Sequence, residues 1–242
     1  MKKTLLIAAA ALAAGIISTE ASSVYSQNIV GYANISTPNG GTYLLTVPFS
    51  VGVSNGANEI WPLVGGQPTI PDFSQLLTWN GSGYDTYYSD SGSPSLWDDA
   101  SQSAIPNAPR LLPGQAFFLV PSGDLTNSFT GSIPVNVGTS NNMSLPNGGT
   151  YLIGSVVPYG GVITNGTSSG GGLALSSNNG LPDFSQLLIW NGSGYDTYYS
   201  DSGSSSLWDD ASQSSIPTAP SVSVGQGFFV VPSDNFTWNV GL

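Results

Sequence analysis

Hydrophobic and polar positions alternate in short stretches along this chain. Short runs rich in Leu, Val, Tyr, Phe and Trp stand between clusters of Gly, Pro, Asn, Asp and Ser. With 31 Gly and 17 Pro in 242 residues, turn signals interrupt the chain too often for a long helical period to survive. The pattern therefore predicts an all-β protein built from short strands.

The sequence predicts one β-hairpin in detail. Residues 76–79 and 84–88 predict two strands, and the sequence Asn-Gly-Ser-Gly at 80–83 supplies the positive φ angles of a tight turn. A short strand is expected at 96–97. The apolar run at 116–120, which follows a Pro-Gly turn, predicts a buried central strand. Alternation places Tyr84, Thr86 and Tyr88 on one face of the second hairpin strand and Tyr87 on the other, so one face should be core.

The chain contains the same unit twice. Residues 72–122 and 183–233 agree at 41 of 51 positions, and PNGGTYLL at 38–45 recurs as PNGGTYLI at 146–153. This predicts two tandem homologous domains, residues 22–133 and 134–242, each a small β-sandwich or a partly open barrel. The segments 50–70 and 160–181 differ most between the two copies.

The first 21 residues predict a secretory signal peptide. Lys2 and Lys3 precede an apolar stretch at 5–17, and Thr19-Glu20-Ala21 offers a small-x-small cleavage site. The apolar stretch is too short to span a membrane, and no later segment predicts a transmembrane helix. We expect a secreted protein, located outside the cell or at its surface.

The net charge limits the classes of partner that the protein is expected to bind. Without residues 1–21 the chain keeps Arg110 as its one basic residue against 13 acids, a net charge of −12. Phosphate binding needs clustered Lys and Arg, so nucleic acid is excluded as an expected partner. Neutral glycans, divalent cations and other copies of the chain remain.

The composition also limits which catalytic mechanisms the chain could use. The chain has no Cys and no His, which removes disulfides, thiolate nucleophiles and the Ser-His-Asp triad. The segment that begins at Asp201, DSGSSSLW, is similar to the active-site loop of pepsin-like aspartic proteases, and Asp90 begins its counterpart. The alternative is an Asp-Ser-Gly β-turn. We expect a protein that is not an enzyme, with the Asp90/Asp201 hydrolase as a remote alternative.

Aromatic residues cluster in the repeated hairpins. Planar rings beside Asp and Asn suit sugar binding, although large aromatics also fill cores. The candidate glycan-binding residues are Trp79, Tyr84, Tyr87, Trp97, Trp190, Tyr195, Tyr198 and Trp208.

Acids cluster in the same region, where Asp in Gly/Ser loops could supply oxygen ligands to Ca²⁺. The spacing D-x-D-x-D-G does not occur, so turn formation is the competing interpretation. No cofactor is expected, except that calcium could bind at Asp90, Asp98, Asp99, Asp201, Asp209 and Asp210.

The order of several motifs along the chain is the basis of a resemblance to a known family. SQNIVGY at 26–32 is followed by GTYLLTVPF at 41–49, WNGSGYDTY at 79–87, Trp97-Asp98 and PGQAFFLVPS at 113–122. This order resembles a family of uncharacterised secreted β-rich repeat proteins of verrucomicrobial-type bacteria. It is loosely similar to a bacterial surface module with the pattern GWNLISLP…WNGxGY…PGxGFF. The resemblance implies an extracellular or cell-surface location, and it brings no catalytic residues.

Edge strands are usually protected by Lys and other charges, which this chain almost lacks. Self-association is therefore one candidate property, and the alternative is a soluble monomer whose edge strands are bulged or covered by loops. We expect a secreted, non-catalytic protein with a structural or adhesive role at the cell surface or in the extracellular matrix. The alternative is a pair of carbohydrate-binding modules that use the aromatic and Asp hairpins, with or without calcium.

Overall fold

The computed structural model describes residues 30–49, 58–59, 70–132, 140–163, 173, 175 and 180–241. The predicted signal peptide lies outside these residues, as do most of the two divergent segments. Every regular element in the described part of the chain is a β-strand, which confirms the all-β prediction.

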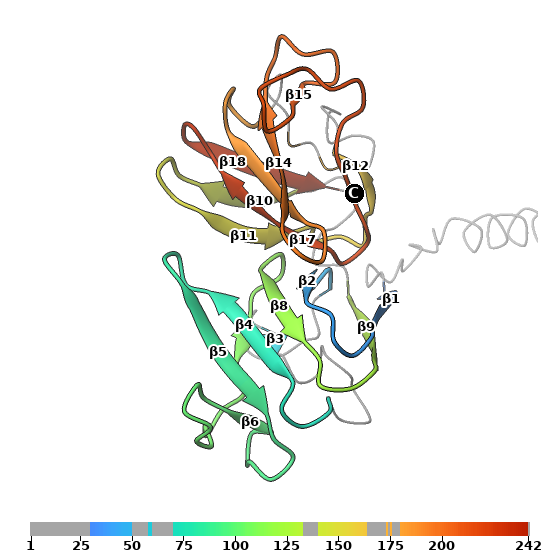
Figure 1. Cartoon of the computed structure of the whole chain (residues 1–242), viewed down its shortest axis with the longest axis vertical. Helices are drawn as coiled ribbons and strands as arrows, with labels where there is room; N and C mark the ends of the chain where they lie inside the picture. Colours follow the sequence, from blue (N-terminus) through green and yellow to red (C-terminus); the bar gives the residue numbers. More distant parts are fainter. Residues whose placement is uncertain are drawn as a thin grey trace, which may run out of the picture.

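The strands form two halves with the same order of elements (Figure 1). The first half contains β1 (Val30–Thr37), β2 (Tyr43–Thr46), β3 (Asn58–Glu59), β4 (Gln75–Trp79), β5 (Tyr84–Ser89), β6 (Trp97–Asp98), β7 (Arg110–Leu111), β8 (Ala116–Val120) and β9 (Leu125–Ser132). The second contains β10 (Ser140–Leu145), β11 (Tyr151–Gly154), β12 (Gly161–Val162), β13 (Gln186–Trp190), β14 (Tyr195–Ser200), β15 (Trp208–Asp209), β16 (Ser221–Val222), β17 (Gly227–Val231) and β18 (Phe236–Gly241).

Each half is built on a five-stranded antiparallel sheet. The strand order is β2-β8-β4-β5-β6 in the first half and β11-β17-β13-β14-β15 in the second. The predicted hairpin is confirmed as β4–β5, with Trp79 opposite Tyr84. The predicted buried strand is confirmed as β8, which pairs on both sides with β2 and β4.

A two-stranded ribbon covers one face of each large sheet. In the first half β1 pairs with β9, and Ala33 and Leu125 pack with Leu76 and Phe117 of the sheet. In the second half β10 pairs with β18, and Leu145 and Trp238 pack with sheet residues in the same way. Each half is thus a small sandwich with its own core. Among the described residues no sheet closes into a barrel.

The other face of each large sheet meets the other half. A third apolar cluster joins Leu44, Ala116 and Phe118 of the first half to Leu152 and Phe229 of the second. The molecule is therefore elongated, with the two halves stacked at their sheets (Figure 1).

The contacts across this junction are reciprocal. The Thr46 amide donates to the Gly225 carbonyl at 2.8 Å, and the Gly154 amide donates to the Gly114 carbonyl at 2.8 Å. Thr46 and Gly154 occupy equivalent places in the two repeats, as do Gly114 and Gly225. Such an exchange of equivalent contacts is typical of a two-fold interface. The halves of one chain thus pair as the subunits of a symmetric dimer do.

Small residues allow the sheets of the two halves to approach each other closely. A Cβ on Gly227 would lie 2.5 Å from the Cβ of Ala116, and a Cβ on Gly154 would lie 2.5 Å from the Cβ of Thr46. Since such distances are below van der Waals contact, larger side chains at either glycine would push the two sheets apart.

Candidate functional site

Six aromatic rings form a closed cycle at the junction of the two halves. Each ring meets its neighbours edge-on, with centroids 5.1–5.7 Å apart. Edge-to-face packing of this kind is the geometry that the quadrupoles of aromatic rings favour. In order around the cycle the rings are Trp79, Tyr84, Phe118, Trp190, Tyr195 and Phe229.

Polar atoms of the cycle are bonded across the junction too. The indole Nε1 of Trp79 donates to the Thr150 carbonyl, and that of Trp190 donates to the Thr42 carbonyl, both at 2.8 Å. The hydroxyls of Tyr84 and Tyr195 are hydrogen-bonded to each other. Four of the eight candidate glycan-binding residues are therefore structural contacts between halves, although Tyr84 and Tyr195 remain 39% and 38% exposed.

This environment changes the acidity of the two tyrosines. Burial raises the pKa of Tyr84 and of Tyr195 above the ordinary value for tyrosine, because it disfavours the charged phenolate. For Tyr195 the hydrogen bond to Tyr84 raises the pKa further. Both side chains therefore keep their protons, and their mutual hydrogen bond, beyond the pH at which an exposed tyrosine ionises.

The other four candidate aromatics face the domain cores. Trp97 and Trp208 are fully buried, with 0% of their surface exposed, so they present no ring face to a sugar in this structure. Tyr87 and Tyr198 are half-buried and pack against the core of their own half. The predicted alternation along β5 is confirmed, since Tyr84 lies on the junction face and Tyr87 on the core face.

The candidate calcium ligands hold their own loops. Asp90 accepts a hydrogen bond from the Gly92 amide at 2.8 Å, and Asp99 accepts one from the Ser101 amide at 2.8 Å. Asp98 is buried and accepts a hydrogen bond from the hydroxyl of Ser93. The same pattern recurs in the second half at Asp201, Asp210 and Asp209. These carboxylates thus serve as turn acceptors, the competing interpretation of the sequence.

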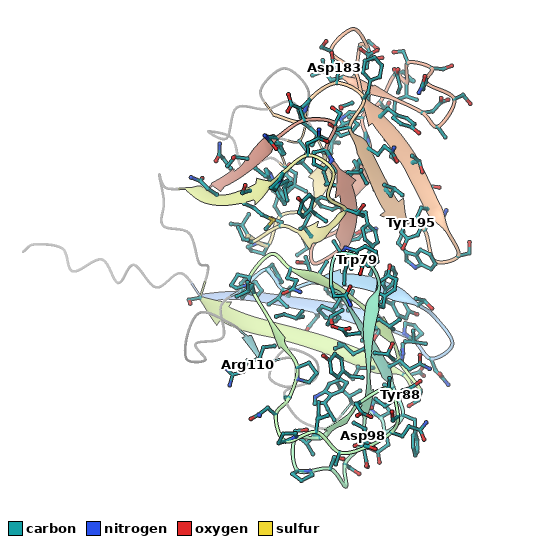
Figure 2. The ribbon with its side chains drawn as sticks, turned by 90° about the vertical axis from the view of Figure 1, so that its left-hand side faces the viewer. Trp79, Tyr88, Asp98, Arg110, Asp183 and Tyr195 are labelled. Carbon is teal, nitrogen blue, oxygen red and sulfur yellow. The ribbon has the colours of Figure 1, made fainter. Side chains whose placement is uncertain are left out.

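In the described part of the chain no three acidic side chains gather where they could hold a metal ion. Asp90 and Asp201 also do not form a pair. Asp90 shares a turn with Ser93 and Asp98 at one end of the molecule, and Ser202 binds Asp183 at the opposite end (Figure 2). An aspartic-protease mechanism needs two carboxylates that share one proton, and these two are too far apart for that.

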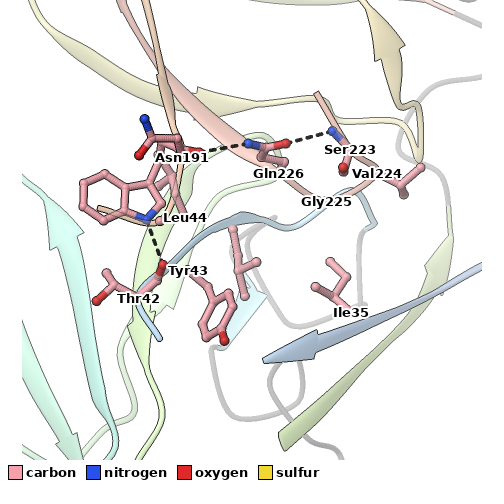
Figure 3. A pocket seen from close by; sticks show the side chains of 12 residues that line it. Ile35, Thr42, Tyr43, Leu44, Asn191, Ser223, Val224, Gly225 and Gln226 are labelled. Carbon is pink, nitrogen blue, oxygen red and sulfur yellow. Dashed lines mark hydrogen bonds between the residues drawn. The ribbon is translucent and has the colours of Figure 1, made fainter. Parts of the chain in front are cut away.

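Among the described residues, two cavities flank the junction, and the sequence analysis predicts neither of them. The first, of about 310 Å³, lies between β2 and the loop at 223–226, and Trp190 is among its lining residues (Figure 3). The second, of about 290 Å³, lies between β11 and the loop at 112–115. The linings of both cavities contain no charged residue. Most residues of the second cavity are the repeat equivalents of residues in the first, so the two cavities lie at corresponding places of the pseudo-two-fold arrangement.

Two exposed phenylalanines were also missed. Phe73 and Phe184 are each 68% exposed, and their φ angles of 67° and 65° lie in the left-handed region. The Ser74 amide donates to the Pro71 carbonyl at 3.2 Å and closes a β-turn in which Phe73 is the third residue. With positive φ, this position favours Gly or Asn. The sequence Pro-Asp-Phe-Ser signals a turn, but not that its ring points to solvent.

Comparisons with protein-family models, curated protein sequences and solved structures find no match to this chain. Within the described ranges, no helix has the length and apolar character needed to cross a bilayer. What the structure defines is an all-β protein of two similar halves.

Proposed function

We propose that this protein is a secreted, non-catalytic structural or adhesive component of the cell surface or extracellular matrix. The observation that carries the proposal is the reciprocal junction, which joins two similar halves into one body with like ends. A body with equivalent surfaces at both ends can contact two partners at once. Such bivalence strengthens attachment without any new contact.

The use of the acidic residues supports this proposal. In both halves the loop carboxylates accept hydrogen bonds from the amides and hydroxyls of their own turns. In the structure these carboxylates therefore shape their own loops. The loops themselves contain no basic residue. A strongly acidic surface of this kind keeps molecules apart at low ionic strength, and it associates more readily when salt screens the charge.

Localisation tests the proposal directly. An antibody against the protein should detect it in the culture medium or on the surface of intact cells, and deletion of its gene should weaken cell-to-cell or cell-to-support attachment. Expression of the wild-type chain from a plasmid should restore attachment. Retention of the protein inside the cell, or unchanged attachment in the deletion strain, would contradict the proposal.

Binding of neutral glycans is the second candidate function, and one observation favours it. Tyr84 and Tyr195 are the exposed members of the aromatic cycle, and they lie at hairpin ends beside Asp85 and Asp196. We expect retention on neutral polysaccharide columns to be lost in Tyr84→Ala/Tyr195→Ala. Tyr88→Ala/Tyr199→Ala serves as the matched control, and equal retention of all three proteins would argue against this site.

A further inference from the structure

We propose that Phe73 and Phe184 are knobs that insert into the two junction cavities of other copies of this chain, so that the protein assembles into open-ended arrays. This inference deepens the proposed structural role and rests on it. It names the partner as a second copy, the contact as ring into cavity, and the product as an assembly that does not close.

The knobs have the features of a binding anchor. Each ring is two-thirds exposed and stands on a residue whose backbone conformation a bulky side chain adopts at a cost. The turn itself does not need the ring, because its hydrogen bonds run through backbone atoms and through Ser74 and Ser89. An aromatic ring kept at such a position, where glycine would fit better, is available for contact with a partner.

The cavities match the knobs in size and polarity. A cavity of about 150 Å³ lined by apolar residues is enough to bind benzene, and the junction cavities hold about 310 and 290 Å³. Leu44, Leu45 and Ile35 line the first cavity, and Leu152 and Ile153 line the second.

Charge and position favour this contact over a direct contact between knobs. Each knob follows a carboxylate, exposed Asp72 or half-buried Asp183, so that two knob surfaces repel each other. The cavity linings are uncharged and do not repel the knob. Asp183, next to one knob, lies toward one end of the molecule (Figure 2), and both cavities are lined by residues of the two halves at their junction. A contact between two different surfaces of the same molecule is heterologous, and it propagates unless a rotation closes it into a ring.

The test uses the purified protein and its molar mass by light scattering over a series of concentrations and NaCl concentrations. We expect the mass to grow with both variables, since salt screens the repulsion between acidic chains. Phe73→Gly/Phe184→Gly should raise the concentration needed for assembly by about tenfold or more. Its melting temperature should stay equal or rise, because glycine accepts a positive φ.

Matched variants distinguish the effect of the phenyl ring from the effect of the backbone conformation. Gln102→Gly/Gln213→Gly relieves the same left-handed conformation at exposed polar positions, where φ is 57° in both halves, and should assemble as the wild type does. Leu112→Trp/Ser223→Trp places bulk at the mouths of the two cavities and should stop assembly while the knobs remain.

A mixture gives the decisive result. The knob-free and cavity-blocked variants should each stay monomeric, and together they should assemble, because one supplies the cavities and the other the knobs. A wild-type protein that stays monomeric at all salt concentrations would overturn the inference, as would a mixture that does not grow. Assembly that proceeds equally without the phenylalanines would overturn the knob contact and leave the structural role in place. Failure of the localisation and attachment experiments would instead remove that role.

Discussion

At the scale of single residues, left-handed backbone conformations divide into two kinds. Leu96 and Leu207 have φ angles of 65° and 66° and are half-buried, and Leu96 packs against the core of its half. Phe73 and Phe184 share the same φ region, but their rings face solvent. The side chain thus offsets the backbone strain by packing at the leucines, whereas at the phenylalanines only backbone hydrogen bonds hold the conformation in the folded monomer.

This difference predicts opposite effects of glycine. Leu96→Gly should lose about 2 kcal/mol of unfolding free energy, because the packing of an apolar side chain is removed. Phe73→Gly should be neutral or more stable by up to about 1 kcal/mol, because the left-handed penalty is relieved. Urea denaturation of the monomer at low salt measures both. A loss of equal size in the two variants would show that the Phe73 ring stabilises the folded monomer.

At the scale of elements, the repeated hairpins tie the two halves together. The end of β4 places the Trp79 indole against the Thr150 carbonyl, and the end of β13 places Trp190 against Thr42. Within each hairpin loop, the Asn80 or Asn191 side chain accepts hydrogen bonds from two loop amides. Local turn chemistry thereby positions a ring that acts in the other half of the molecule.

Removal of the two indole hydrogen bonds should weaken the junction. Trp79→Phe and Trp190→Phe should each cost about 1 kcal/mol, since each leaves a half-buried carbonyl without its donor. The two costs should be similar because the contacts are reciprocal. Tyr43→Phe/Tyr151→Phe, which removes exposed hydrogen bonds to Pro38 and Pro146 within each half, is the control and should cost less. Equal unfolding free energies for all variants in urea would contradict this role of the indoles.

At the scale of the whole molecule, the junction should be sensitive to alkali. The folded-state pKa of Tyr84 and of Tyr195 is raised above the unfolded value by burial and, for Tyr195, also by its hydrogen bond to Tyr84. A raised folded pKa means that the folded state holds its proton longer than the unfolded state. The stability contribution is therefore complete below the unfolded pKa of about 10, and it is lost as the pH rises through the folded pKa values.

We therefore expect the unfolding free energy to fall as the pH is raised from about 9 to about 11. Tyr84→Phe/Tyr195→Phe should show a smaller fall, because two of the shifted groups are gone while Tyr87 and Tyr198 remain. Urea denaturation at each pH gives the comparison, and the ionisation of tyrosine can be followed by its ultraviolet absorbance. Falls of equal size in the two proteins would show that this pair does not control the alkaline limit.

Much of the architecture could be predicted from local patterns. The hairpin at 75–89 follows from alternating apolar positions around an Asn-Gly turn, and the buried strand β8 follows from an unbroken apolar run after Pro-Gly. Asp residues in Ser/Gly turns permit two interpretations from sequence, calcium ligand or turn acceptor, and the structure shows their turn hydrogen bonds. These features depend on neighbours in sequence, which is why the pattern contains them.

The sequence by itself determined the all-β class, the duplication, the acidic surface and the places of the turns, because each depends on composition or on residues close in the chain. Only the tertiary structure decided which aromatic side chains contact the other half and which fill the core of their own half. Trp79 and Trp97 look alike in sequence, yet Trp79 joins the two halves and Trp97 fills a core. Alternation marks an apolar face, but what covers that face depends on contacts between residues more than seventy positions apart. The knobs at Phe73 and Phe184 and the cavities between the halves follow from that packing.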